Sequence, residues 1–308
     1  MKKTQQINFL GIGMQKAGTT WLFNNLKSIP EFDLPPLKEI HYFDRDKAYH
    51  SKNKLAQTKL WKRLINPKYL YEAIVTLAMT VFTDYKSFCF YKKWFFTDYT
   101  DKWYMSLFDH FSGYKGEITP SYSILDKKDV ERIYQLMPNV KLVLILRNPI
   151  ERAWSHYRFK TRKFKNFNVE NVNNTEIIKF LDAERQSSRS DYIRTLKNFS
   201  SVFPKHQLLI CFFDAIDDNP KGLLNDIIKH ITGKTSISTS HLNLAKRANK
   251  SRDVNCPKEI EQYLKNRYHD QIKELSELHG GYFTKWYQES YAQDANKSYQ
   301  HLSPTIYM

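Results

Sequence analysis

The feature that most constrains the fold is an apolar run near the N-terminus that leads into two glycines four residues apart. Residues Ile7 to Gly13 form a short, mainly apolar segment without alternation, which is typical of a strand buried on both faces. Gly13 and Gly18 then enclose a tight loop, and Trp21 to Leu26 place apolar residues on one helical face. The order of strand, glycine loop and helix predicts a site where backbone N–H groups and the helix N-terminus hold a phosphate.

The lysine of this loop does not stand where nucleoside triphosphatases have it. The pattern G-x-x-x-x-G-K-[ST] needs Lys directly after the second glycine, whereas this sequence has Thr19 there and Lys16 inside the loop. A nucleotide with one phosphate on its 5′ side needs neither the reach of that lysine nor Mg²⁺. Lys16, Thr19 and Thr20 therefore favour an anion-binding loop over a P-loop kinase. They also favour it over an ordinary tight turn whose glycines only allow positive φ.

Two further apolar runs place the first strand in a parallel sheet. They are Lys141 to Leu146 and Leu208 to Phe213, each followed by a stretch with helical periodicity. This alternation predicts an α/β fold, a P-loop-like three-layer α/β/α architecture with a central, mainly parallel sheet. Residues 45–114 carry many lysines and aromatic residues without an obvious strand, so we expect a helical insert there. No linker interrupts the 308 residues, which predicts a single domain over 1–308.

A second anion site is predicted at the end of the second apolar run. Arg147 follows Leu146 directly, and Ser155 lies eight residues later on a helix that Pro149 opens. A planar guanidinium and a hydroxyl at the carboxyl edge of the sheet are suited to a second phosphate. The alternative is that Arg147 pairs with a carboxylate such as Glu151 and that Ser155 is solvated. Together with the glycine loop, the pair favours a ligand with phosphates on both its 5′ and 3′ sides.

Charge and cysteine content define the class of partner and the compartment. The chain has 48 Lys and Arg against 32 Asp and Glu, a net charge of +16, which indicates an anionic partner. Three widely spaced cysteines fit neither a disulfide framework nor a zinc site, so a reducing compartment is expected. The apolar run from Ala73 to Phe82 is too short to span a bilayer, which takes roughly 20 residues. We expect a protein without a transmembrane segment, located in the cytoplasm.

Four ordered motifs give the sequence a resemblance to sulfotransferases. The segments Phe9–Leu22 and Leu144–Tyr157 resemble the two cofactor signatures of that family, which uses 3′-phosphoadenosine 5′-phosphosulfate as its donor. The segments Lys38–Asp44 and Gly116–Tyr122 are similar to those of heparan sulfate glucosaminyl sulfotransferases and their bacterial relatives. Because the membrane anchor and C-terminal disulfide of the Golgi members are missing, the resemblance implies a bacterial, cytoplasmic member.

The resemblance also implies which residues hold the donor and its product, 3′,5′-adenosine bisphosphate. The 5′-phosphosulfate would be held by the glycine loop and the start of its helix, namely Lys16, Ala17, Gly18, Thr19, Thr20 and Trp21. Arg147 and Ser155 would hold the 3′-phosphate. The counterpart of the family's C-terminal cofactor loop is Lys250-Ser251-Arg252, which assigns Lys250 and Arg252 to the cofactor although the family's glycine is absent. No metal is required by this chemistry.

Sulfuryl transfer needs positive charge on the transferring oxygens and a base for the acceptor proton. Lys16 is the candidate for the charge, since it can follow the group as the bond breaks. Glu39 is the candidate base, because the matching acid of the glucosaminyl enzymes has that role, and a neighbouring sulfate is expected to raise its pKa. His41 is the competing base, as in cytosolic sulfotransferases of small molecules. The alternatives are a salt bridge between Glu39 and Lys38 and a packed core histidine.

The acceptor is less defined by the sequence than the donor. Aromatic residues with interleaved lysines between Tyr85 and Tyr104 are suited to stacking on sugars, to contact with acidic lipid, or to the core of the insert. We expect a hydroxyl or amine acceptor, most readily a saccharide, with phenol, peptide tyrosine and lipid as alternatives that pair with His41 as base. A nucleic-acid-binding protein would explain the charge but not two anion motifs at strand ends, so no nucleic acid partner is expected. The sequence does not define the oligomeric state.

Overall fold

The computed structural model describes residues 7–51, 55, 59–161, 172–244, 255–292 and 302–308. Its centre is a five-stranded sheet with the order β2-β1-β3-β4-β5. The strands are β1 (Phe9–Gly13), β2 (Gly116–Ile118), β3 (Lys141–Leu146), β4 (Leu208–Phe212) and β5 (Thr305–Tyr307). The first four are parallel and β5 is antiparallel to β4, so the predicted mainly parallel sheet is confirmed.

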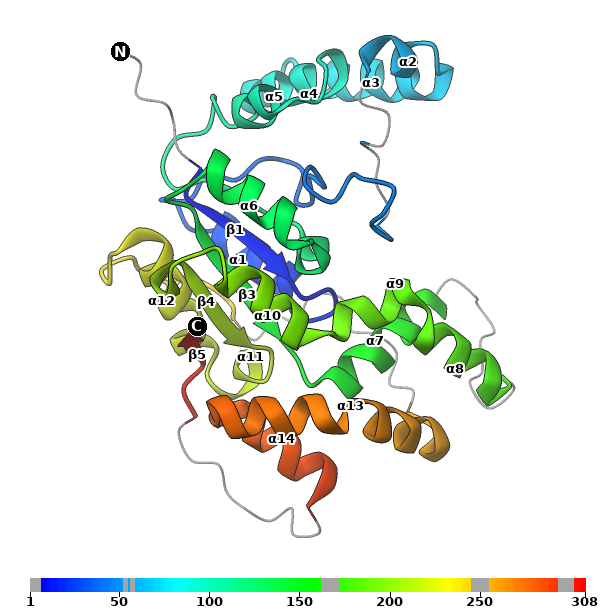
Figure 1. Cartoon of the computed structure of the whole chain (residues 1–308). Coiled ribbons are helices and arrows are strands. Elements are labelled where there is room, and N and C mark those ends of the chain that lie inside the picture. The colour runs from blue at the N-terminus through cyan, green and yellow to red at the C-terminus, as the bar shows by residue number, and fades with distance from the viewer. Residues whose placement is uncertain (1–6, 52–54, 56–58, 162–171, 245–254, 293–301) are drawn as a thin grey trace.

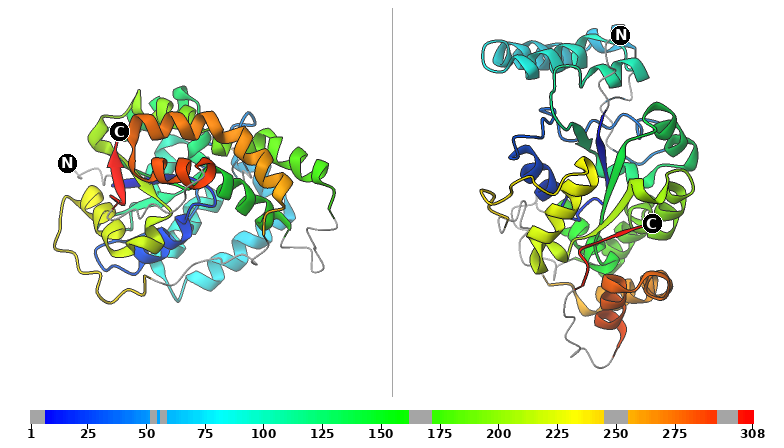
Figure 2. Two further views of the ribbon diagram at one scale, coloured as in Figure 1. Left: turned by 90° about the horizontal axis from the view of Figure 1, so that it is seen from below. Right: turned by 90° about the vertical axis from the view of Figure 1, so that its left-hand side faces the viewer.

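Helices cover both faces of the sheet, which confirms the three-layer architecture. Figure 2 shows α1 (Thr19–Lys27) and α12 (Pro220–Thr232) on one face, and α6 (Lys127–Leu136) and α10 (Tyr192–Ser200) on the other. The central strands β1, β3 and β4 are buried except for Lys141 at the start of β3, as their apolar sequences require.

The remaining helices lie mostly beyond the carboxyl ends of the strands. They are α7 (Pro149–Thr161), α8 (Asn174–Asp182), α9 (Glu184–Ser187), α11 (Ala215–Asp218), α13 (Lys258–His279) and α14 (Gly281–Tyr291). The described ranges also contain the short 3₁₀ helices η1 (Pro120–Ile124), η3 (Ser188–Ser190) and η4 (Lys205–Gln207).

The three strands predicted from apolar runs are all present, and two others were not predicted. β3 has the predicted bounds, β1 begins two residues later than expected, and β4 ends one residue earlier. β2 and β5 have only three residues each, too few for an apolar run to be visible, and β2 has a glutamate at its centre. That glutamate, Glu117, is fully buried and becomes important for the site.

The segment predicted as a helical insert contains four helices. They are α2 (Leu60–Leu64), α3 (Pro67–Thr80), α4 (Tyr85–Phe96) and α5 (Asp101–Ser106). Figure 1 shows them as a layer above the sheet, away from α7, α13 and α14.

The aromatic residues Phe90, Trp94, Tyr99 and Trp103 are buried and pack on one another, and the buried Tyr104 stacks on Tyr42. Most of the aromatic residues considered for sugar stacking therefore form the core of the insert.

Candidate functional site

The glycine loop between β1 and α1 has the backbone conformation of a tight anion-binding turn. Lys16 and Gly18 have φ values of 73° and 84°, in the left-handed region, and α1 begins directly afterwards at Thr19. A Cβ atom on Gly18 would lie 2.4 Å from Cδ1 of Ile216, so a side chain at this position is opposed by both strain and contact. The loop thus directs the amino end of a nine-residue helix toward the carboxyl edge of the sheet.

Lys16 and Arg147 lie close together at the ends of neighbouring strands. The Arg147 guanidinium donates to the carbonyl oxygen of Lys16 at 3.5 Å and lies 4.3 Å from the ring centre of Phe213. It also pairs with Glu151 at 2.9 Å, so the carboxylate partner considered from the sequence is present. Because Glu151 is 58% exposed, this pair is worth at most about 1 kcal/mol and a phosphate can replace it.

The helix that follows Arg147 carries Ser155 and His156 into a positively charged region. Ser155 is buried on α7 one turn after Glu151, on the same helical face. Burial lowers the pKa of His156, and the positive charges of Arg152, Arg189, Arg185 and Lys16 lower it further, to about 3. The electrostatic potential here favours an anion.

The remaining residues predicted to bind the cofactor are either buried or outside the described ranges. Ala17 is buried, and Trp21 is buried with its indole N–H donating to the carbonyl oxygen of Leu244 at 3.0 Å. Trp21, in the first turn of α1, therefore holds Leu244 against this helix through its side chain. Lys250 and Arg252 lie outside the described residues.

A second cluster, formed by Lys38, Glu39, His41 and Asp44, lies against the start of α1. The Lys38 ammonium donates to the Thr19 and Thr20 hydroxyls at 3.3 and 3.4 Å and to the Glu39 carboxylate at 3.0 Å. On its other side Glu39 lies 3.4 Å from Nε2 of His41, whose Nδ1 lies 2.7 Å from the fully buried Asp44. Basic and acidic groups thus alternate in the order Lys38, Glu39, His41 and Asp44.

The cluster sets the ionisation of its own members. Burial raises the pKa of Glu39, but hydrogen bonds and charges from His41 and Lys38 outweigh it and lower the pKa to about 2. Burial lowers the pKa of His41, but Asp44 and Glu39 raise it to about 10. Glu39 is therefore ionised and His41 protonated at neutral pH. The raised pKa that we expected for Glu39 applies when a sulfate lies beside it; without that anion, His41 and Lys38 keep the pKa low.

A buried hydrogen-bond network fixes the backbone that carries the cluster. The N–H of Ile40 donates to Oε2 of Glu117 and to the Thr119 hydroxyl, both at 3.0 Å. The Tyr104 and Tyr122 hydroxyls donate to Oε1 of Glu117 at 2.8 and 2.7 Å. His41, the next residue after Ile40, has a φ of 58°, so its backbone is held in a conformation that needs such support. The motif Gly116–Tyr122 therefore positions the cluster rather than adding a reactive group.

Sequence reasoning missed the roles of Lys38, Asp44 and Glu117. Lys38 and Asp44 belong to the motif that contains Glu39, and their alternating charges with His41 were the available signal. The role of Glu117 has little local signal, because Tyr122 lies in the same motif but Tyr104 comes from the insert and Ile40 lies more than 70 residues away.

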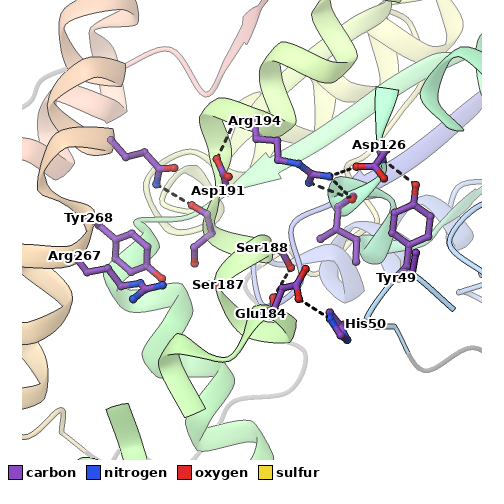
Figure 3. A pocket seen from close by; sticks show the side chains of 14 residues that line it. Tyr49, His50, Asp126, Glu184, Ser187, Ser188, Asp191, Arg194, Arg267 and Tyr268 are labelled. Atoms are coloured by element: carbon purple, nitrogen blue, oxygen red, sulfur yellow. Dashed lines mark hydrogen bonds and ion pairs between the residues drawn. The ribbon is translucent and has the colours of Figure 1, made fainter. Parts of the chain in front are cut away.

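A pocket of about 600 Å³ opens beside this region, between α9, η3 and α13 (Figure 3). Its wall carries hydroxyl groups from Tyr49, Ser188 and Tyr268, and an ion pair between Arg194 and Asp126. The segment that continues from Asp44 forms one side of the pocket, since Ser51 donates to the Asp44 carbonyl oxygen at 2.9 Å and residues 48–50 line the wall.

The geometry defines a class: an α/β protein with two candidate anion sites at the carboxyl edge of a parallel sheet and a cluster of ionisable residues beside one of them. The sulfotransferase domain family matches residues 7–297 of this chain. The chain belongs to this family. The heparan sulfate glucosaminyl subtype has no comparable support.

Three known proteins illustrate the similarity. The membrane-associated sulfotransferase kil1 of Dictyostelium discoideum is 25% identical over 166 residues, which are 51% of this chain and 24% of that protein. This chain thus spans less than two thirds of that relative. A sulfotransferase structure from Alicyclobacillus acidocaldarius has a TM-score of 0.58 at 19% identity, over 89% of this chain and 95% of the other. A sulfotransferase domain from the curacin biosynthetic pathway has a TM-score of 0.48 at 14% identity, over 86% of this chain and 98% of that domain.

Proposed function

We propose that this enzyme transfers a sulfuryl group from 3′-phosphoadenosine 5′-phosphosulfate to a hydroxyl or amine of a saccharide, with Glu39 as the base. The observation that carries the proposal is the position of Glu39, held between Lys38 on the loop side and the His41–Asp44 pair. A carboxylate fixed beside an anion-binding loop is the arrangement that an in-line transfer with proton removal requires.

The residues at the two strand ends fit the proposed donor. The loop from Lys16 to Thr20 offers backbone N–H groups, two hydroxyls and the ammonium groups of Lys16 and Lys38 for the 5′ side. Arg147 and the buried Ser155 are assigned to the 3′-phosphate, and the charges that lower the pKa of His156 lie in the same region. When bound, the donor supplies the sulfuryl group and a phosphate leaving group. The proposal gives no role to a metal, because lysines and arginine provide the positive charge.

Lys38 links the loop to the base. Its ammonium contacts the Thr19 and Thr20 hydroxyls and the Glu39 carboxylate, so an anion in the loop competes with Glu39 for this charge. As the ammonium turns toward the loop, the pKa of Glu39 rises and the carboxylate becomes a stronger proton acceptor. His41, oriented by Asp44, stays hydrogen-bonded to Glu39 and keeps it aimed at the acceptor.

His41 is the weaker candidate for the base. Its pKa is raised to about 10, so near neutral pH the imidazole already carries the proton that a base would have to take up. A phenol, peptide tyrosine or lipid acceptor with His41 as base stays the alternative, and it would require His41 to lose that proton when substrate binds.

The acceptor is proposed to be a saccharide because of the pocket beside the cluster. Its hydroxyl groups and ion pairs offer hydrogen-bonding partners for sugar hydroxyls, beside apolar surface on which a sugar ring can lie. The similarity of Lys38–Asp44 to glucosaminyl sulfotransferases points the same way. We further propose that residues 1–308 form one sulfotransferase domain of a bacterial, cytoplasmic protein, in keeping with its three free cysteines.

Transfer of labelled sulfate from the donor onto a panel of glycans, amines and phenols tests the proposal. Glu39→Gln should lower kcat by about 10²–10⁴-fold while leaving donor affinity within a few fold. Glu277→Gln, at an exposed glutamate on α13, is the control and should retain full activity. Loss of kcat in His41→Ala with retention in Glu39→Gln would assign the base to His41. Labelling of phenols but of no glycan would refute the saccharide acceptor.

A further inference from the structure

The helical insert exposes an unusually large apolar face. Among the described residues, all large hydrophobic side chains with high exposure except Leu278 and Tyr307 lie between Trp61 and Phe96. Phe82, in the turn between α3 and α4, is 94% exposed, and Tyr71 and Met79 on α3 are exposed by 72% and 70%. We call the surface formed by Trp61, Ile65, Tyr71, Ile74, Met79 and Phe82 the insert face. Contiguous apolar surface of this kind marks an interaction site.

The apolar character of the insert face comes from the whole of α3 and not from a single side chain. This 14-residue helix has only two charged residues, Lys68 and Glu72, and only Ala73 is buried in it. A helix that is apolar nearly all round is normally covered on every side, whereas α3 packs against α2 and α4 along only part of its surface and buries a single residue, Ala73. The outer side of the helix therefore lacks the partner that its sequence calls for.

The charges around the insert face identify the kind of partner. Lys59, Lys62, Lys68 and Lys92 are exposed on α2–α4 or beside them, and within the described part of the chain none of them forms an ion pair with a carboxylate. Lys62 lies 5.5 Å from the ring centre of Trp61, so cationic and aromatic groups are adjacent. A second copy of the chain would bring these lysines together, whereas an anionic lipid surface complements them.

The length of the helix indicates how such a surface would be engaged. No helix in the described ranges is long and apolar enough to cross a membrane. An apolar helix face with flanking lysines and with Trp, Tyr and Phe is suited to lying in the headgroup region instead. We propose that the insert face binds the surface of anionic membranes, with Phe82 and Ile74 entering the boundary between headgroups and acyl chains. This docking surface is separate from the loop, the acid–base cluster and the pocket.

Vesicle co-sedimentation with the full chain tests the proposal. The protein should bind phosphatidylcholine vesicles that contain phosphatidylserine, and added salt should weaken binding. It should bind much less to phosphatidylcholine alone. Phe82→Asp should reduce the partition coefficient by about 10-fold or more, since it removes the exposed phenyl group that the bilayer would bury. Leu278→Asp on α13, at 65% exposure, is the matched control and should bind as the wild type does.

The charge contribution has its own pair of variants. Lys62→Glu combined with Lys68→Glu should abolish the preference for anionic vesicles, while Lys128→Glu combined with Lys229→Glu, on α6 and α12, should leave most of it. Circular dichroism confirms that each variant is folded, which is expected because the changed side chains are exposed.

Three outcomes would overturn the proposal: no binding to anionic vesicles, equal binding to both vesicle types, or equal effects of Phe82→Asp and Leu278→Asp. A dimer in light scattering that Phe82→Asp dissociates, without vesicle binding, would assign the face to a second copy of the chain.

Discussion

Replacement of Glu117 by glutamine should disturb both stability and catalysis, although Glu117 touches no proposed substrate. The change keeps the side-chain volume and replaces one acceptor oxygen by an NH₂ group. Oε2 accepts from the rigid N–H of Ile40, so the amide places its NH₂ group toward the Tyr104 and Tyr122 hydroxyls. Two buried hydrogen bonds to a carboxylate are lost, at about 1–2 kcal/mol each, which gives about 2–4 kcal/mol of destabilisation. Because Ile40 precedes His41, kcat should also fall.

Urea unfolding and steady-state transfer measured on the same samples check this prediction. Glu277→Gln, exposed on α13 and 3.9 Å from Lys273, is the control and should change stability by less than about 0.5 kcal/mol. If Glu117→Gln costs less than about 1 kcal/mol and retains full activity, the buried network does not position the cluster, and the argument from its hydrogen bonds is wrong.

Two further predictions concern the cluster and the loop. The pKa of His41 is raised from 6.5 to about 10, so its charge stabilises the fold fully below pH 6.5 and this contribution is lost as the pH rises through 10. NMR should find the imidazole still protonated well above pH 6.5, and Asp44→Asn should move its titration down; an unmoved titration would refute the pairing. Gly18→Ala should destabilise the protein by about 1–3 kcal/mol more than Gly233→Ala. Both positions have positive φ, but only Gly18 has neighbours within 4 Å, and equal losses in urea unfolding would contradict this.

The parts of the fold that the sequence predicts are those encoded by local pattern. β1, β3 and β4 are continuous apolar runs, and the loop after β1 is marked by two glycines and a lysine. Arg147 is found because it directly follows a buried strand, which fixes its place at the edge of the sheet. For features that depend on a single segment, the local sequence pattern was sufficient to predict the structure.

The parts that escape prediction depend on contacts between distant segments. Lys38 reaches Thr19 and Thr20 only because the segment that carries it lies against the start of α1. The position of Lys38 contributes to the low pKa of Glu39. From the sequence, the aromatic residues from Tyr85 onward were candidates for contact with sugar or lipid. In the structure most of them form the core of the insert. The exposed face lies on α2 and α3 instead, since exposure depends on which helix covers which.

The most direct test of the account is calorimetric binding of 3′,5′-adenosine bisphosphate to the wild type and to Arg147→Ala. We predict that it binds without metal and more tightly than ATP with Mg²⁺. Arg147→Ala should weaken binding by about 10–100-fold, as expected for loss of a hydrogen bond to a charged group. Adenosine 5′-monophosphate, which lacks the 3′-phosphate, should bind more weakly, and Arg147→Ala should not change its affinity. The control Lys229→Ala should leave the affinity for both ligands unchanged. Tighter binding of ATP with Mg²⁺, or equal effects of Arg147→Ala on both adenosine phosphates, would contradict a two-phosphate site at the strand ends.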